Sequence, residues 1–140
     1  MPESRQIPAC CTVPLPAWPF AQVQPQLSLY SCSFDQQALS DQAFVQAGIP
    51  APANIQHAVA KRQTEFLAGR LCARSALHSH NGQAEHPGQN SDGTPLWPAG
   101  LCGSITHSKG LAAAVVASRQ QFLGIGLDAE VLMSATRAQR

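Results

Sequence analysis

The spacing of apolar residues is most regular between positions 55 and 78, where it predicts one long amphipathic helix. This segment contains no proline, and its only glycine is Gly69. A glycine inside a helix costs about 1 kcal/mol relative to alanine, so we expect it to allow close approach of another backbone or a ligand. The apolar positions are Ile55, Val59, Phe66, Leu67, Leu71 and Leu77, and the polar side carries Lys61, Arg62, Arg70 and Arg74.

Shorter elements are predicted before this helix. Residues 26–34 alternate apolar and polar positions imperfectly, which favours a strand. Asp35 is expected to cap a helix that reaches Val45 and stops before Pro50. Residues 1–25 are rich in proline and are interpreted as an extended arm, with Trp18 and Phe20 as its anchors.

Three further segments follow the long helix. Residues 80–98 are rich in glycine, proline and asparagine and predict a loop. Residues 110–118 contain an apolar run long enough for a strand buried on both faces, although its alanines leave a helix as the alternative. Residues 122–128 alternate apolar residues with Gly124 and Gly126, which predicts a strand with room for something to lie against it.

Composition narrows the possible classes of protein. With 140 residues, 44% hydrophobic and 12% charged, the chain is sized and composed for a folded domain. Its formal net charge of +1 gives no field that would attract nucleic acid. We expect neither a membrane span nor a secretory signal, and hence a cytoplasmic location. The five cysteines are irregularly spaced, which argues against a disulfide framework and against a paired zinc site.

Two groups of residues could carry chemistry near the C-terminal end. Asp128 and Glu130 follow a predicted strand and would share one face, where two carboxylates suit a hard cation such as Mg²⁺. They could equally be a helix cap and a solvated first-turn residue. Thr106 and His107 lie in a run of small polar residues, 103–108, interpreted as a loop that could hold phosphate. An ordinary surface histidine remains the alternative.

The helix arginines and one turn complete the candidates. Arg70 and Arg74 are four residues apart and share a helix face, and guanidinium groups bind phosphate in a bidentate way. Arg62 lies further round the helix, and a solvated face paired with Glu65 is the alternative for all three. Residues 93–98 predict a rigid turn that presents backbone to a ligand ring, or a tight loop anchored by its tryptophan.

Taken in order, four pieces of the sequence resemble the 4′-phosphopantetheinyl transferase superfamily, most closely its enterobactin synthase component D branch. They are RQTEFLAGR at 62–70, PLWP at 95–98, GSITHS at 103–108 and GIGLDAE at 124–130. The resemblance extends from about residue 53 to residue 130. Members of this family transfer the phosphopantetheine arm of coenzyme A to a serine of an acyl or peptidyl carrier protein.

The resemblance implies a role for each candidate residue. Asp128 and Glu130 would bind Mg²⁺, and Thr106 with His107 would contact the phosphates of coenzyme A. The arginines would hold its 3′-phosphate region, and the turn would lie against the adenine. The helix residues concerned are Arg62, Arg70 and Arg74, and the turn residues are Gly93, Thr94 and Pro95. No catalytic base is assigned, because the family places it in a second half. The branch suggests a siderophore-type pathway.

The implied fold is α+β: one half of the family's pseudo-dimer, with a small sheet packed on a long helix. We divide the chain into 1–52 and 53–123, both within the N-terminal domain, and 124–140, the start of a catalytic domain. No tryptophan–x–x–lysine–glutamate helix follows Glu130, so we expect a fragment, or a site completed by a partner or by self-association. The alternatives are an inactive nucleotide-binding or interaction module, and a zinc or redox protein that uses the cysteines and histidines.

Overall fold

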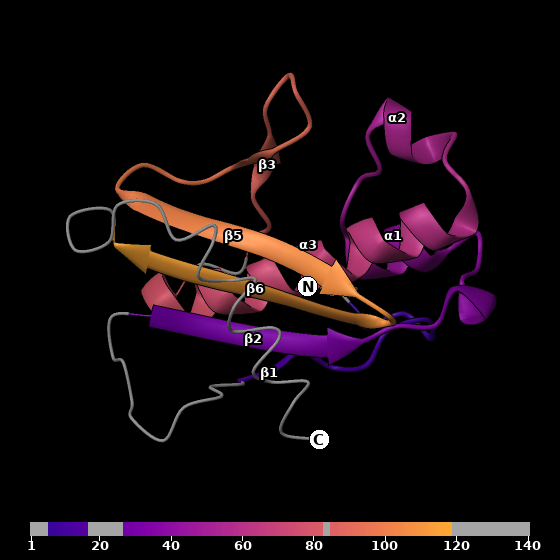
Figure 1. Ribbon diagram of the computed structural model, residues 1–140, viewed down its shortest axis with the longest axis horizontal. Helices are drawn as coiled ribbons and strands as arrows, with labels where there is room; N and C mark the ends of the chain where they lie inside the picture. The colour runs from indigo at the N-terminus through magenta and orange to yellow at the C-terminus, as the bar shows by residue number, and fades with distance from the viewer. Residues whose placement is uncertain (1–5, 17–26, 83–84, 119–140) are drawn as a thin grey trace.

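A computed structural model describes residues 6–16, 27–82 and 85–118 of the chain. An antiparallel four-stranded sheet, in the order β1-β2-β6-β5, packs against the long helix α3 (Figure 1). The sheet consists of β1 (Leu15–Pro16), β2 (Leu27–Ser33), β5 (Leu101–Ser108) and β6 (Leu111–Ser118). The helices are α1 (Ala43–Ala47), α2 (Ala53–Gln56) and α3 (Ala60–Asn81), and a short ribbon pairs β3 (Gly88–Gln89) with β4 (Pro95–Leu96). The expected α+β class, a small sheet on a long helix, is confirmed.

The strand predicted at residues 110–118 is confirmed as β6, one of the two inner strands of the sheet. It pairs antiparallel with β2 on one side and with β5 on the other. Every residue from Leu111 to Ala117 is buried, so both faces of the strand are covered. The alternative of an alanine-rich helix is therefore excluded, because two flanking strands satisfy the backbone and small side chains allow close packing.

The segment predicted as one helix, residues 55–78, is divided between two helices, α2 and α3. The helix is interrupted at residues 57–59, between α2 and α3, and the side-chain amide of Gln63 donates to the carbonyls of Ile55 and Gln56 across this interruption. Val59 has extended backbone dihedral angles and is 73% exposed, so it does not belong to the expected apolar face. At the other end α3 runs to Asn81 and stops at Gly82, whose left-handed φ of 82° ends the helix.

The helix predicted from Asp35 to Val45 is two separate pieces. The carboxylate of Asp35 does act as a cap, but for a short 3₁₀ turn, Gln36–Ala38, where it accepts a hydrogen bond from the amide of Gln37 at 3.0 Å. Leu39 then returns to an extended conformation, and α1 begins only at Ala43. Propensity did not reveal this interruption because the residues between the two pieces are individually compatible with a helix.

Residues 103–108 are not a loop but most of strand β5. Their side chains alternate: Gly103, Ile105 and His107 face α3, and the residues between them face the other way. The backbone is paired on one side with β6, so these N–H groups do not form a phosphate-binding loop. The hairpin turn that follows is Lys109–Gly110, and both residues have positive φ angles of 50° and 80°, as a two-residue turn of this twist requires.

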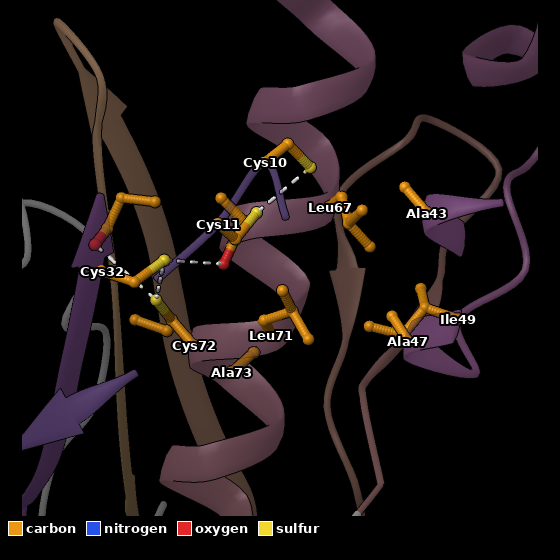
Figure 2. Close-up of a cluster of buried hydrophobic side chains, with 13 residues drawn as sticks. Cys10, Cys11, Cys32, Ala43, Ala47, Ile49, Leu67, Leu71, Cys72 and Ala73 are labelled. Carbon is orange, nitrogen blue, oxygen red and sulfur yellow. Dashed lines mark hydrogen bonds between the residues drawn. The ribbon is translucent and has the colours of Figure 1, made fainter. Parts of the chain in front are cut away.

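The core between α3 and the sheet is built from small side chains. Figure 2 shows alanine and cysteine side chains gathered beside Leu67 and Leu71. All five cysteines are buried thiols, and the sulfur atoms of Cys32 and Cys72 lie 3.5 Å apart. Such side chains let the helix backbone come close to the strands.

Gly69 is the position of closest approach between α3 and β5. A Cβ atom there would lie 2.6 Å from Cγ2 of Ile105, so the glycine makes room for a side chain of β5 rather than for a backbone or a ligand. Through this contact α3 lies close enough to β5 for residues of the two elements to build a common site.

Some expectations lie outside the described residues. They are the strand at 122–128, the carboxylates Asp128 and Glu130, the segment 124–140 and the anchors Trp18 and Phe20. Within the described ranges, no helix has both the length and the apolar character needed to cross a lipid bilayer.

Candidate functional site: an anion pocket between α3, the 93–95 turn and β5

One pocket collects most of the described candidate residues. It has a cavity volume of about 140 Å³ and lies where α3 meets the turn at residues 93–95 and the end of β5. Its lining residues are Arg62, Glu65, Phe66, Arg70, Gly93, Pro95, Ile105 and His107. The packing of α3 on the sheet therefore brings together residues that are more than 40 positions apart in the sequence.

Arg70 is the more deeply buried of the two arginines that line this pocket. The residue is only 4% exposed, which corrects the expectation that it lies on a polar helix side. Its guanidinium carbon lies 4.7 Å from the centre of the Phe66 ring, one helical turn earlier. Phe66 in turn stacks on Phe44 with ring centres 6.3 Å apart, so α1 supports the arrangement.

The charge of Arg70 is not compensated by the described residues. No ion pair involves it there, and its Nη1 atom is buried without a hydrogen-bond partner. Burial, followed by repulsion from Arg62, lowers the pKa of Arg70 to about 10. A buried cation without a counter-charge is costly, so the position is suited to an anionic ligand.

Arg74 is buried as well, at 9% exposure, but it has a different role. Its Nη1 atom donates to the carbonyl of Ala47 at the end of α1. It is not among the residues that line the pocket. Arg74 therefore ties α3 to α1, and the shared helix face of Arg70 and Arg74 does not place both in one anion site.

A histidine and a carboxylate that both line the pocket lie next to each other. His107 Nδ1 on β5 lies 3.6 Å from Oε2 of Glu65 on α3, and the two form an ion pair when the ring is protonated. The side chain of Glu65 is 13% exposed and that of His107 38% exposed, so the imidazole keeps access to the pocket. Arg62 is exposed at the rim.

The turn at 93–95 is held by its own hydrogen bonds. Asp92 accepts from the backbone amide and the hydroxyl of Thr94 at 3.0 and 2.6 Å, and these bonds lower the pKa of its carboxyl. Gly93 has a φ of 92°, a left-handed conformation that favours glycine, and its backbone N–H donates to the carbonyl of Asn90 at 2.9 Å. Gly93 and Pro95 line the pocket, whereas the side chain of Thr94 is exposed and engaged with Asp92.

Thr106 does not join this group. It follows Ile105 and precedes His107, both of which face α3, so its side chain is on the other face of the sheet. Three lining residues were not predicted as site residues: Glu65, Phe66 and Ile105. For Phe66 a signal was present, because residues four apart on a helix are neighbours and Arg70 is four positions later.

The hypothesis of a zinc protein is not supported by the residues that the structure describes. Among the described residues no group of three or more histidine, cysteine, aspartate or glutamate side chains is placed to hold a metal ion. Cys72 and Cys32 instead contact each other inside the core, where the neighbouring thiol and burial raise the pKa of Cys72.

Comparison with known proteins agrees with this geometry. Residues 51–117 match the model of the 4′-phosphopantetheinyl transferase N-terminal domain. This segment includes α3, the turn and most of the sheet, and therefore every residue that lines the pocket. Over residues 51–117 the chain therefore has the N-terminal domain of the 4′-phosphopantetheinyl transferase superfamily, and its similarity to enzymes of that superfamily supports the same assignment.

Two of the individual relatives are named 4′-phosphopantetheinyl transferases, and a third is an enterobactin synthase component. The chain is 42% identical over 76 residues to the 4′-phosphopantetheinyl transferase Npt of Nocardia iowensis, a match that covers 54% of this chain and 34% of the relative. It is 41% identical over 76 residues to PptT of Mycobacterium tuberculosis, with the same coverage of 54% and 34%. To enterobactin synthase component D of Escherichia coli K12 it is 42% identical over 91 residues, 65% of this chain and 42% of that protein. The matches thus span less than half the length of these relatives.

Proposed function

We propose that this chain supplies the coenzyme A-binding part of a 4′-phosphopantetheinyl transferase and that the pocket holds the 3′-phosphate of coenzyme A. The observation that carries the proposal is Arg70, a buried guanidinium without a counter-charge among the described residues. A phosphate dianion placed beside this guanidinium would supply the missing negative charge and would accept charge-assisted hydrogen bonds from its N–H groups. Arg62 and His107, which line the same pocket, would contact the remaining phosphate oxygens.

The residues that line the pocket favour a nucleotide over a free anion. Gly93 and Pro95 contribute backbone and a flat ring to the lining of the same pocket as the guanidinium. A purine attached to the phosphate would lie against this turn, which its internal hydrogen bonds keep rigid. Pre-organisation of this kind lowers the entropy cost of binding. Arg74 and Thr106 are left out of the ligand contacts, because one ties α3 to α1 and the other faces away.

The finer parts of the function rest on sequence and on the relatives. Asp128 and Glu130 would hold Mg²⁺ on the pyrophosphate, as their spacing and the family resemblance imply. The acceptor would be the serine hydroxyl of an acyl or peptidyl carrier protein. A carrier of siderophore biosynthesis is suggested by the similarity to enterobactin synthase component D.

Calorimetric titration with adenosine 3′,5′-bisphosphate tests the binding proposal. Arg70→Met should weaken binding about ten-fold or more, since a hydrogen bond to a charged group contributes about 1.5–3 kcal/mol. Lys61→Met is the matched control: it removes the same charge from an exposed position of the same helix that does not line the pocket. Equal losses in both variants would indicate a diffuse electrostatic effect and would contradict a specific site.

Transfer is tested separately, with a fluorescent pantetheine arm on coenzyme A and an apo carrier protein. We expect labelling that requires Mg²⁺ and is lost on addition of EDTA and in Asp128→Ala. Nucleotide binding without transfer would support the pocket while rejecting catalysis by this chain alone.

A further inference from the structure

A carboxylate in a pocket for an anion needs an explanation. Glu65 lines the pocket together with Arg62, Arg70 and His107, and its side chain is largely buried. A negative charge at this position would repel a phosphate unless another group compensates it. Two arginines line the same pocket, yet among the described residues the ion-pair partner of Glu65 is the imidazole of His107.

The choice of partner has a chemical consequence. A carboxylate paired with a guanidinium would occupy the forked donors that bind phosphate best. Paired with His107, the carboxylate occupies one ring nitrogen and leaves both arginines to the ligand. A histidine ring has two nitrogens on opposite edges, and the partner of one decides the state and direction of the other.

We propose that Glu65 is a positioning residue that holds His107 by Nδ1, so that Nε2 is presented to the phosphate of the ligand. The two side chains come from α3 and β5, and the close contact of Gly69 with Ile105 fixes the distance between these elements. In the bound state Nδ1–H faces Glu65 and Nε2–H faces the anion. The inference rests on the proposed binding of a phosphate in this pocket, but it makes a separate prediction for the free protein.

Other charged groups nearby do not replace this pair. Lys61, Asp35 and Lys109 line a neighbouring hollow that also touches Glu65 and His107. Within the ranges that the structure describes, none of these three forms an ion pair with either residue. The described geometry therefore assigns the orientation of the imidazole to Glu65.

A double-mutant cycle with adenosine 3′,5′-bisphosphate tests the inference. Glu65→Ala should weaken binding about five-fold, the effect of losing one ordinary polar contact. In the His107→Ala background the same substitution should not weaken binding, because there is no ring left to orient. Glu65→Gln keeps an acceptor of the same size and should recover part of the affinity. Glu85→Ala, which removes an exposed carboxylate outside the pocket, should have no effect.

The opposite sign would overturn the proposal. If Glu65 only repels the ligand, Glu65→Ala will bind the bisphosphate more tightly than the wild type. Equal weakening in both backgrounds would also contradict it, because the effect would then not pass through His107.

Nitrogen NMR of the free chain separates this inference from the proposed function. In the neutral ring of His107 the proton should reside on Nδ1 in the wild type and in Glu65→Gln, and shift toward Nε2 in Glu65→Ala. An unchanged tautomer would refute the role of Glu65 whether or not nucleotide binds. A changed tautomer without bisphosphate binding to the wild type would leave the positioning role standing and reject the ligand.

Discussion

Replacing Arg70 with methionine should stabilise the unliganded chain while it impairs ligand binding. Methionine keeps an unbranched side chain of comparable length and removes a charge that is 4% exposed and has no counter-charge among the described residues. Because burial and Arg62 lower the pKa of Arg70 to about 10, the folded state disfavours the charged form at every pH below that value. The gain should therefore be present at neutral pH and should disappear as the pH rises above 10.

The size of the gain follows from two opposing effects. Replacing buried charges by packed apolar groups often stabilises a protein by about 1–4 kcal/mol. The contact between the guanidinium and the Phe66 ring is lost, which offsets about 0.5–2 kcal/mol. A net stabilisation of about 1–2 kcal/mol corresponds to a rise in Tm of about 3–6 °C for a chain of this size.

Thermal unfolding followed by circular dichroism at pH 7.5 measures this effect. Lys61→Met is again the control and should change stability by no more than about 0.5 kcal/mol, because its side chain is exposed. A lower Tm for Arg70→Met, with Lys61→Met unchanged, would refute the reasoning. It would mean that the guanidinium is already satisfied in the unliganded protein and is not held ready for an anion.

Three further outcomes are expected. Arg74→Ala should lower the unfolding free energy by about 2–4 kcal/mol in a urea titration, because it leaves the Ala47 carbonyl without its donor; an unchanged midpoint would contradict this. Gly69→Ala should destabilise the chain by about 1–3 kcal/mol despite better helix propensity, because its Cβ would meet Ile105. In an Ile105→Ala background the same substitution should no longer destabilise the chain. Because the contact with Cys32 and burial raise the pKa of Cys72, the folded state keeps this thiol protonated, and stability should fall as the pH rises above 9.0. Thermal scans under reducing conditions should show a flatter pH dependence for Cys72→Ala; the same slope as the wild type would refute the assignment.

The class of fold could be predicted because the sequence expresses it locally. The long apolar run at 111–117 and the periodicity before residue 78 indicate a buried strand and a helix by themselves. The break at 57–59 could not be read in this way. It depends on the side chain of Gln63, which bonds to carbonyls seven and eight residues earlier.

The pocket was predictable only in part, for a similar reason. Motif residues such as Arg62, Gly93 and His107 do line it, and their joint occurrence was visible in the sequence. Helical spacing could not separate Arg70 from Arg74, because both lie on one face. What separates them is tertiary: the carbonyl of Ala47 takes up one guanidinium, and the ring of Phe66 supports the other.

A strand that contains many polar residues is also difficult to predict from the sequence. Residues 103–108 are small and polar enough to predict a loop, but pairing with β6 makes them a strand. The alternation that follows sends His107 to the pocket and Thr106 to the opposite face. A glycine such as Gly103 fits a strand here because Trp97 occupies the space that a side chain would need.

The most direct test of the central claim compares the affinities of the chain for coenzyme A and for dephospho-coenzyme A, which lacks only the 3′-phosphate. If Arg70, Arg62 and His107 hold that phosphate, coenzyme A should bind at least about ten times more tightly, the equivalent of about 1.4 kcal/mol, and Arg70→Met should abolish the difference. Equal affinities for the two compounds in the wild type would contradict the assignment of the pocket.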